Sequence, residues 1–227
     1  MTLPIGWVGF DLGNTLVRYF TSEEFGGLLA EAVGRAGRLL AARSFAVPDA
    51  VELGRRIAAE NYEAEDNRVR PVEERLGRIF GVQELYLLSL MAIEFVVPLL
   101  DGGQAYTDAL PVLRRLRERG VRTALVSNTP WGTPAGPWRQ DLGRHGLDRY
   151  LDVTVFCRDI GWRKPSSRIF QHLLRVTGAA AGEVLFVGDH PVWDVEGARA
   201  CGLRAVLLDR GGQTGIAGLE EVFALLA

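Results

Sequence analysis

Apolar residues are spaced along the chain in two different ways, and each spacing predicts a different kind of element. Five short apolar runs, rich in β-branched and aromatic residues, have the length of buried strands. They cover residues 5–10, 123–126, 153–156, 184–187 and 205–208. Helical patterns lie between or after them, at residues 108–119, 166–176, 192–201 and 220–226. Strands that alternate with helices form a parallel sheet with right-handed crossovers. The pattern therefore predicts an open α/β fold whose strand ends share one edge.

The region between the first two predicted strands has helical spacing throughout. Four helices are expected there, at residues 22–42, 49–66, 71–80 and 82–97. Ser22 is the expected N-cap of the first of them. No strand pattern interrupts these helices, and each has an apolar face that needs a partner. We therefore expect an α-helical bundle at residues 18–104, inserted into a core formed by residues 1–17 and 105–227.

The composition excludes several classes of protein. The chain has 227 residues, of which 48% are hydrophobic, and a formal net charge of −2 with three histidines. That balance gives no electrostatic reason to expect nucleic acid or an anionic membrane as a partner. Residues 1–7 lack the basic start and apolar stretch of an export signal, and the apolar run 85–100 is too short to span a bilayer comfortably. Cys157 and Cys201 are too few for a disulfide framework, so a cytoplasmic protein is expected.

The first predicted strand ends at a carboxylate. Asp11 follows residues 5–10 directly, and Gly13 and Asn14 come soon after it. In an open parallel sheet, ligands bind at the carboxyl ends of the strands, so Asp11 is expected to face a ligand. Gly13 lets the backbone turn close to that ligand, and Asn14 tolerates the left-handed conformation that such turns often need. The alternative, on this stretch alone, is that Asp11 only caps a turn or the next helix.

The same edge is expected to collect polar residues from the other strand ends and the adjacent loops, namely Asp11, Ser127, Asn128, Lys164, Asp189 and Asp194. Carboxylates, a backbone carbonyl and water are ligands that suit Mg²⁺, which leaves positions for phosphate oxygens. Lys164 is the one lysine among 26 Lys and Arg residues, which favours a need for a compact point charge at that position. The set therefore indicates a magnesium site that receives a phosphoryl group.

Each of these residues also has a simpler interpretation. Ser127 and Asn128 are common turn residues, and Asp194 is favourable near the start of a helix. A single lysine at position 164 also fits chance. The functional interpretation depends on the occurrence of the whole group at one sheet edge, because residues so far apart in sequence are hard to explain as separate surface accidents.

The chain resembles the haloacid dehalogenase-like hydrolase superfamily in four motifs that occur in the family's order. They are Asp11-Leu-Gly-Asn-Thr15, Leu125-Val-Ser127-Asn128, Arg163-Lys164-Pro165 and Gly188-Asp189-His-Pro-Val-Trp-Asp194. The resemblance spans residues 10–194. It implies a doubly wound, Rossmann-like parallel sheet with a mobile helical cap inserted between the first and second motifs. That place coincides with the helical bundle expected from the pattern alone.

The resemblance also implies a role for each matching residue. Asp11 is similar to the nucleophile that forms an aspartyl-phosphate intermediate. The implied ligands of Mg²⁺ are Asp11, the backbone carbonyl of Gly13, Asp189 and Asp194, the last directly or through water. The implied phosphate-binding residues are Ser127, Asn128 and Lys164. Lys164 also counts as catalytic, because its charge offsets the repulsion between a carboxylate nucleophile and a phosphate. The expected function is magnesium-dependent hydrolysis of a small phosphorylated metabolite.

One position departs from the family's pattern. Where the family usually has a second aspartate as general acid and base, this chain has Gly13. Such a group contributes roughly 10²–10⁴ in rate. Its loss predicts a slow phosphatase, a phosphatase whose substrate has a good leaving group or supplies its own proton, or a protein that binds phosphate esters without turnover and acts in regulation. A haloacid dehalogenase needs no such acid, but Asp189 and Asp194 favour a metal that a dehalogenase does not need. His190 is a candidate replacement, since histidine titrates near neutrality.

Other residues are candidates for contact with the substrate. The polar candidates in the insert are Asn61, Tyr62, Arg68 and Arg70, and those near the third strand are Arg158 and Asp159. The aromatic candidates for a closed pocket are Tyr19, Phe20, Phe25 and Trp131, which also fit the core. The pattern sets neither the substrate nor the oligomeric state.

Overall fold

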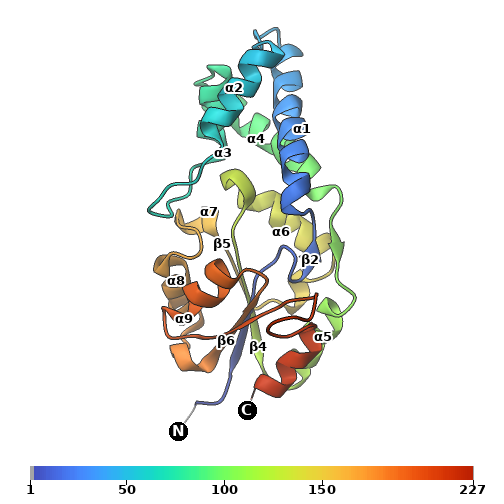
Figure 1. The fold of residues 1–227 in the computed structure, drawn as a ribbon, viewed down its shortest axis with the longest axis vertical. Helices are drawn as coiled ribbons and strands as arrows, with labels where there is room; N and C mark the ends of the chain where they lie inside the picture. Colours follow the sequence, from blue (N-terminus) through green and yellow to red (C-terminus); the bar gives the residue numbers. More distant parts are fainter. Residues whose placement is uncertain (1–2, 227) are drawn as a thin grey trace.

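The computed structural model describes residues 3–226, with a parallel sheet in one half of the molecule and a group of helices in the other (Figure 1). The strands of the sheet are β1 (Trp7–Phe10), β4 (Arg122–Ser127), β5 (Val153–Phe156), β6 (Val184–Gly188) and β7 (Arg204–Leu207). They lie in the order β5-β4-β1-β6-β7, and every neighbouring pair is parallel. The predicted α/β fold with a doubly wound sheet is confirmed, with β1 at its centre.

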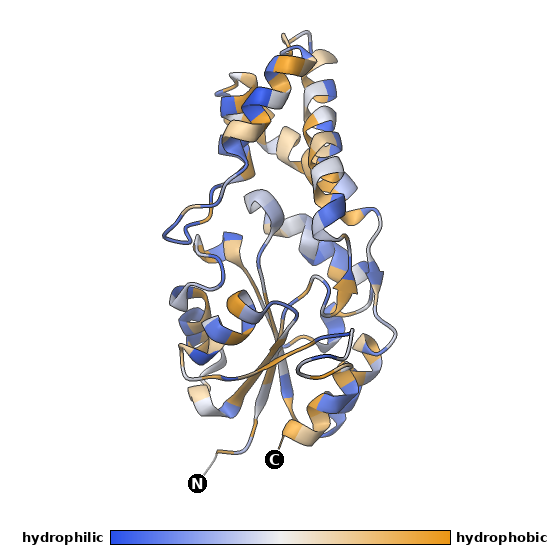
Figure 2. Cartoon of the chain, viewed as in Figure 1, coloured by the Kyte–Doolittle hydropathy of each residue, from blue (hydrophilic) through white to orange (hydrophobic). Residues whose placement is uncertain are grey.

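Both faces of the sheet are buried. Val8 and Phe10 of β1 belong to one hydrophobic core, and Trp7 belongs to a second one. Successive side chains of a strand point to opposite faces, so the two cores lie on the two sides of the sheet. The helices around it are α5 (Ala109–Glu118), α6 (Ala135–Arg144), α7 (Cys157–Ile160), α8 (Ser167–Thr177) and α9 (Gly197–Arg199). Burial on both faces explains why the strands are mostly apolar runs, and Figure 2 shows orange residues within the sheet.

Four helices pack together beyond the carboxyl edge of the sheet (Figure 1). They are α1 (Ser22–Ala41), α2 (Ala50–Glu60), α3 (Val72–Phe80) and α4 (Leu85–Leu100), and we call them the cap helices. Leu29 and Val33 of α1 and Met91 and Phe95 of α4 are buried in one apolar cluster. That cluster continues into one face of the sheet. The expected helical bundle between the first two strands of the sheet is therefore present.

A short antiparallel ribbon lies where the chain passes between the sheet and the cap helices. Its strands are β2 (Val17–Arg18) and β3 (Gln104–Ala105). The boundaries expected after residues 17 and 104 fall inside this ribbon. The division into a core and a cap of residues 18–104 stays a prediction. Residues 1, 2 and 227, at the ends of the predicted core, lie outside the described residues.

Two helix ends differ from expectation for local reasons. The N-cap of α1 is Thr21 rather than Ser22, because the Thr21 hydroxyl accepts from the Glu24 N–H at 3.3 Å and the Glu24 carboxylate accepts from the Thr21 N–H at 2.7 Å. The second helix ends at Glu60 rather than near residue 66. There the buried Arg75 guanidinium donates to the carbonyls of Glu60 and Tyr62, at 2.5 and 2.9 Å, and satisfies groups that a longer helix would bond internally.

Residues 61–70, which we call the cap loop, connect α2 to α3 and touch the core. The Val69 N–H donates to the Gly161 carbonyl at 3.0 Å, and the Arg163 N–H donates to the Asn67 carbonyl at 3.0 Å. An isolated antiparallel bridge also pairs Arg68 with Trp162. The cap loop is therefore hydrogen-bonded to the core segment that immediately precedes Lys164.

The later part of the chain contains more irregular helix than the spacing predicts. The expected helix at 192–201 is a π-helical turn, Pro191–Glu196, followed by the short α9. The last expected helix is a 3₁₀ helix, Leu219–Leu225, and α6 was not expected. Further 3₁₀ turns lie at Pro130–Gly132, Asp148–Tyr150 and Ala181–Glu183.

No single helix among residues 3–226 is long and apolar enough to cross a membrane. The helices α3 and α4 meet the criteria of length and composition only as a pair, and that pair is bent by 107°.

Candidate active site

The turn after β1 places Asp11 at the carboxyl edge of the sheet. The Asp11 N–H donates to the Val187 carbonyl at 2.9 Å, which continues the pairing of β1 with β6 by one residue. Asn14 has φ of 56°, the left-handed conformation expected for it, and its N–H donates to the Val17 carbonyl at 2.7 Å. The chain thus turns back within a few residues and leaves the buried Asp11 side chain at the bottom of a cavity.

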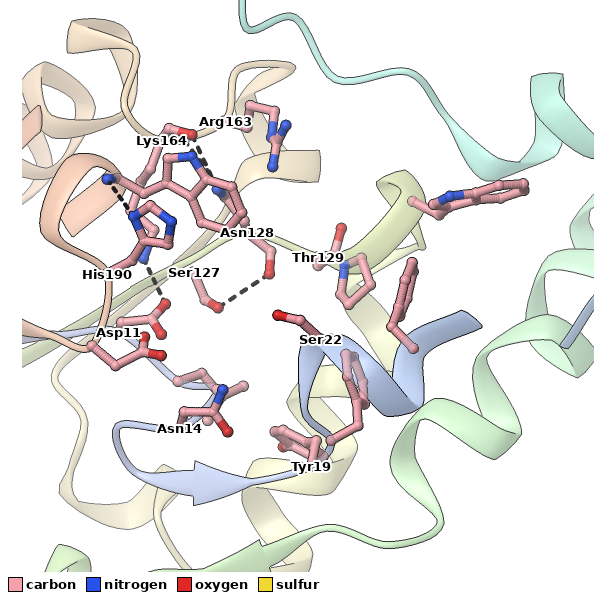
Figure 3. Close-up of a pocket in the computed structure, with 18 of the residues that line it drawn as sticks. Asp11, Asn14, Tyr19, Ser22, Ser127, Asn128, Thr129, Arg163, Lys164 and His190 are labelled. Atoms are coloured by element: carbon pink, nitrogen blue, oxygen red, sulfur yellow. Dashed lines mark hydrogen bonds and ion pairs between the residues drawn. The ribbon is translucent and has the colours of Figure 1, made fainter. Parts of the chain in front are cut away.

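Lys164 joins two carboxylates at this point. Its ammonium donates to Asp11 Oδ1 at 2.5 Å and to Asp194 Oδ1 at 2.6 Å, and its side chain is only 2% exposed. Asp11 and Lys164 come from distant parts of the chain and point toward each other (Figure 3), and Asp194 comes from a third part. A charge this deeply buried requires paired charges and hydrogen bonds, so the site is an ion triad rather than a set of surface residues.

Asn128 positions the lysine through the backbone. The Asn128 amide nitrogen donates to the Lys164 carbonyl at 3.1 Å, and its amide oxygen accepts from the Lys164 N–H at 2.8 Å. Ser127 is buried beside it, and its hydroxyl donates to the Asn128 carbonyl at 3.3 Å. The Asn128 side chain therefore ties the end of β4 to the loop that carries Lys164, a role that sequence reasoning did not give it.

The π-helical turn after β6 positions Asp194. Its carboxylate accepts from the His190 N–H at 3.0 Å through Oδ2, while Oδ1 accepts from Lys164. The Asp194 side chain lies directly on Gly188, where an added Cβ would be 2.3 Å from the Asp194 carboxyl carbon. Any other residue at position 188 would displace Asp194, which explains the glycine that ends β6.

The site carries more negative charge than Lys164 balances. Burial, together with the Asp194 and Asp189 carboxylates, raises the pKa of Asp11 to about 7 against the opposing effect of Lys164. Burial, and then the Asp194 carboxylate, also raises the pKa of Asp189. Burial alone would lower the pKa of Lys164, but Asp11 and Asp194 raise it above its ordinary value. The arrangement therefore favours an additional cation.

The donor atoms fit a divalent ion. Asp11, Asp189 and Asp194 each offer a carboxylate oxygen, and these oxygens lie within 4.8 Å of one another. Hard oxygen ligands of this kind are those that Mg²⁺ prefers, usually with one or two carboxylates and several waters. The predicted metal ligands Asp11, Asp189 and Asp194 therefore converge, and Gly13 lines the same cavity.

Gly13 leaves space where an acid would stand. A Cβ built on this residue meets no other group within 4 Å, and its backbone is not in the left-handed region. The candidate replacement, His190, also lines the cavity. Its Nδ1 accepts from the N–H groups of Val192 and Trp193, at 3.2 and 3.1 Å, and its ring stacks on Trp193. With Nδ1 occupied as an acceptor, the hydrogen of the neutral ring is on Nε2.

The cavity above the triad has a volume of about 590 Å³, within the range of small-molecule sites. All residues of the predicted site line it, and so do the aromatic candidates Tyr19, Phe20, Phe25 and Trp131. Figure 3 shows residues of the core on one side and Ser22 and Tyr19, near the start of the cap helices, on the other. A ligand there would be enclosed by both parts of the chain.

Four candidates lie elsewhere. Arg68 pairs with Asp66, and Arg70 pairs with Glu60 and packs over Tyr62. Arg158 pairs with Glu73, and Asp159 pairs with Arg139. None of the four lines the described cavity, whereas Asn61 and Tyr62 do.

The sequence analysis missed other lining residues, of which Glu63 and Arg163 are charged and Trp138 and Trp193 are aromatic. Arg163 and Trp193 had a usable signal, because each directly precedes a predicted site residue in its motif.

Comparison with known proteins agrees with the fold and with the family resemblance. A sequence model of the haloacid dehalogenase-like hydrolase family matches residues 5–202. A phosphatase of Mycobacterium tuberculosis is 34% identical over 146 residues, which are 64% of this chain and 64% of that protein. A ribulose-1,5-bisphosphate 5-phosphatase of Halopiger xanaduensis is 30% identical over 88% of this chain and 83% of its own length. The chain thus spans just under two thirds of the first relative and most of the second.

Solved structures show the same fold. The 2-haloacid dehalogenase of Pseudomonas syringae superposes with a TM-score of 0.67 and 23% identity, covering 98% of each chain. The sequence match covers most of the chain, so the protein belongs to the haloacid dehalogenase-like hydrolase family.

Proposed function

We propose that the protein is a magnesium-dependent phosphatase that acts on a small phosphorylated metabolite. The single observation that carries this proposal is the convergence of Asp11, Asp189, Asp194 and Lys164 at the bottom of one cavity. A carboxylate nucleophile approaches a phosphate dianion only where positive charge cancels their repulsion. The names of the relatives from Mycobacterium tuberculosis and Halopiger xanaduensis, both phosphatases, support the same reaction class.

The residues divide the chemistry among them. Asp11 attacks the phosphorus, the bond from phosphorus to the ester oxygen breaks, and the alcohol leaves with a proton from solvent. Water then cleaves the aspartyl-phosphate, which releases inorganic phosphate and restores the Asp11 carboxylate. Lys164 fixes Oδ1 of Asp11, which leaves Oδ2 for the attack. Ser127 and the backbone at Asn128 lie beside the place where the phosphoryl oxygens must bind. Asp11, Asp189, Asp194 and the Gly13 carbonyl would hold Mg²⁺, which supplies charge neutralisation for the phosphoryl group.

The first experiment measures hydrolysis of p-nitrophenyl phosphate with Mg²⁺ and after treatment with EDTA. We expect the rate to fall at least about 100-fold without the ion, since removal of one strong electrostatic stabiliser costs 10²–10³ in rate. Asp189→Asn should raise the half-saturating Mg²⁺ concentration at least about tenfold. Glu220→Gln, at an exposed carboxylate outside the cavity, is the matched control and should not change it. Hydrolysis that is equally fast in EDTA would contradict the proposal.

The second experiment restores the missing acid. Gly13→Asp fits the free space at position 13 and should increase kcat for alkyl phosphates by about tenfold or more, within the range for general acid catalysis. The same substitution should increase kcat for p-nitrophenyl phosphate less, because the p-nitrophenolate leaving group needs no proton. Gly13→Asn adds the same bulk without an acid, and we expect no such gain from it. Equal gains for alkyl and aryl phosphates would mean that protonation of the leaving group does not limit the native enzyme.

The second candidate function is binding of phosphate esters without turnover. The observation that favours it is the absence of a side chain at position 13. A chain that binds phosphate esters in a Mg²⁺-dependent way, yet does not hydrolyse p-nitrophenyl phosphate, would be such a protein.

A further inference from the structure

Arg163 directly precedes Lys164 but faces a different part of the same cavity. The Lys164 ammonium reaches down to Asp11, whereas Figure 3 shows the Arg163 guanidinium directed into the space above Asn128 and Thr129. The Arg163 side chain is 16% exposed and lines the cavity. A largely buried guanidinium therefore borders the volume that a substrate would fill.

The hydrogen-bond donors of this guanidinium are not satisfied by the protein. Its nearest carboxylate oxygen is Glu63 Oε2, at 3.6 Å, which is beyond the usual range for an N–H···O hydrogen bond. The same Glu63 oxygen lies closer to the buried Arg75, at 3.1 Å. Within residues 3–226 the Arg163 side chain donates no hydrogen bond, and its guanidinium carbon lies 5.1 Å from the centroid of the Trp193 ring.

The other charges of the cavity are accounted for. Lys164 is held between Asp11 and Asp194, and Asp189 belongs to the acidic group that suits a cation. Glu63 lies between two arginines, so this wall of the cavity keeps one positive charge in excess. Tyr62, Trp131 and other aromatic residues form much of the remaining wall. A guanidinium with unfilled donors in such surroundings is a strong binding site for an oxyanion.

We propose that Arg163 is a specificity-determining residue that binds a second anionic group of the substrate, a carboxylate or a second phosphate. The proposal rests on the proposed phosphatase function, because it assumes that the first phosphate lies against Asp11 and Lys164. Asp11, Lys164 and Arg163 line the same cavity of about 590 Å³, so one small molecule in that cavity can reach both anchors. Substrates that carry only the scissile phosphate leave the Arg163 donors unfilled and bind more weakly.

The test compares substrates that differ only in the second anion. 3-Phosphoglycerate and glycerol 3-phosphate differ by a carboxylate, and propane-1,3-diol bisphosphate and its monophosphate differ by a phosphate. For at least one pair we expect the native enzyme to have a kcat/KM about 10- to 100-fold higher for the member with the second anion, which is the scale of hydrogen bonds to charged groups. The preference should lie mainly in KM. The pair that shows it identifies the anion as a carboxylate or a phosphate.

Variants separate binding from a purely structural role. Arg163→Met should bring the preference within each pair close to one, and Arg163→Lys should retain part of it because the charge remains. Arg68→Met is the matched control, since Arg68 also packs over an indole ring, that of Trp162, but lies outside the cavity. It should leave the preference unchanged. A native enzyme with no preference in either pair, or an Arg163→Met variant that keeps the native preference, would overturn the proposal.

A binding measurement keeps this test separate from the test of turnover. Calorimetric titration of the same pairs into Asp11→Asn, with Mg²⁺ present, reads the preference without catalysis. A chain that hydrolyses none of these esters, yet binds the charged members more tightly through Arg163, would contradict the phosphatase function and still support the second anion site. A chain that hydrolyses p-nitrophenyl phosphate but shows no such preference would support the phosphatase function and contradict the second anion site.

Discussion

Asp11→Asn should reduce Mg²⁺-dependent hydrolysis of p-nitrophenyl phosphate by at least about 10³-fold, the scale on which loss of a catalytic nucleophile acts. The amide retains the shape of the carboxylate and accepts from Lys164 through its oxygen, but it is a poor nucleophile and a poor ligand for Mg²⁺. Steady-state kinetics over a range of enzyme concentrations measures the loss. Asp159→Asn, which changes a carboxylate paired with Arg139 outside the cavity, is the control and should retain native activity.

The same variant should fold at least as well as the native chain without Mg²⁺. Burial and the neighbouring carboxylates raise the pKa of Asp11 to about 7, so a charged carboxylate at this position is a cost to the metal-free fold. The asparagine side chain would remove that charge while Lys164 keeps its contact with Asp194. We expect a melting temperature in EDTA that is equal to or above the native value. A large decrease would show that the activity was lost through misfolding, and would leave Asp11 without support as the nucleophile.

Lys164→Met should destabilise the protein and also inactivate it. The substitution leaves two buried carboxylates, those of Asp11 and Asp194, without their shared cation. Breaking a buried ion pair on one side costs about 3–5 kcal/mol, which for a chain of this size lowers the melting temperature by roughly 10 °C. Mg²⁺ should restore part of that loss, because it supplies positive charge to the same oxygens. The activity should fall about 10²-fold or more, as for loss of an electrostatic stabiliser.

Two further variants test whether the effects of Lys164→Met arise from the loss of a buried positive charge at this position. Arg115→Met removes an arginine from an exposed pair with Glu220 and should cost less than about 1 kcal/mol, with native activity. Lys164→Arg retains the charge, but its planar fork is a poor substitute for an ammonium that sits between two carboxylate oxygens, so it should be more stable than Lys164→Met and still slow. Equal melting temperatures for Lys164→Met and the native chain would contradict the buried triad.

The fold was predictable from the sequence where the residues of a short segment determine its local structure. Buried strands of a two-sided sheet are uninterrupted apolar runs, and β1, β4, β5, β6 and β7 were found on that basis. Gly and Asn in the first motif predicted the turn that leaves Asp11 at the sheet edge, and the positive φ of Asn14 agrees. The convergence of the acidic residues followed from topology, since parallel strands end at one edge.

The parts that could not be predicted depend on long-range contacts. The end of α2 is set by the Arg75 guanidinium, which arrives from α3 and satisfies the carbonyls of Glu60 and Tyr62. The role of Asn128 depends on the backbone of Lys164, 36 residues away. Arg163 is a similar case, because only the folded chain shows which arginine borders the cavity and which is solvated. The roles of the site residues remain predictions that the variants above test.

The two hydrogen bonds between the cap loop and the segment before Lys164 have a mechanical consequence. Val69 and Asn67 are bonded to Gly161 and Arg163, so the cap loop, which lines part of the cavity, is held by backbone bonds to the segment that carries Lys164. The cap loop cannot move away from the core at this side unless both hydrogen bonds break or the segment before Lys164 moves with it. Access to the cavity and the position of the Lys164 ammonium against Asp11 are in this way linked through the same backbone bonds.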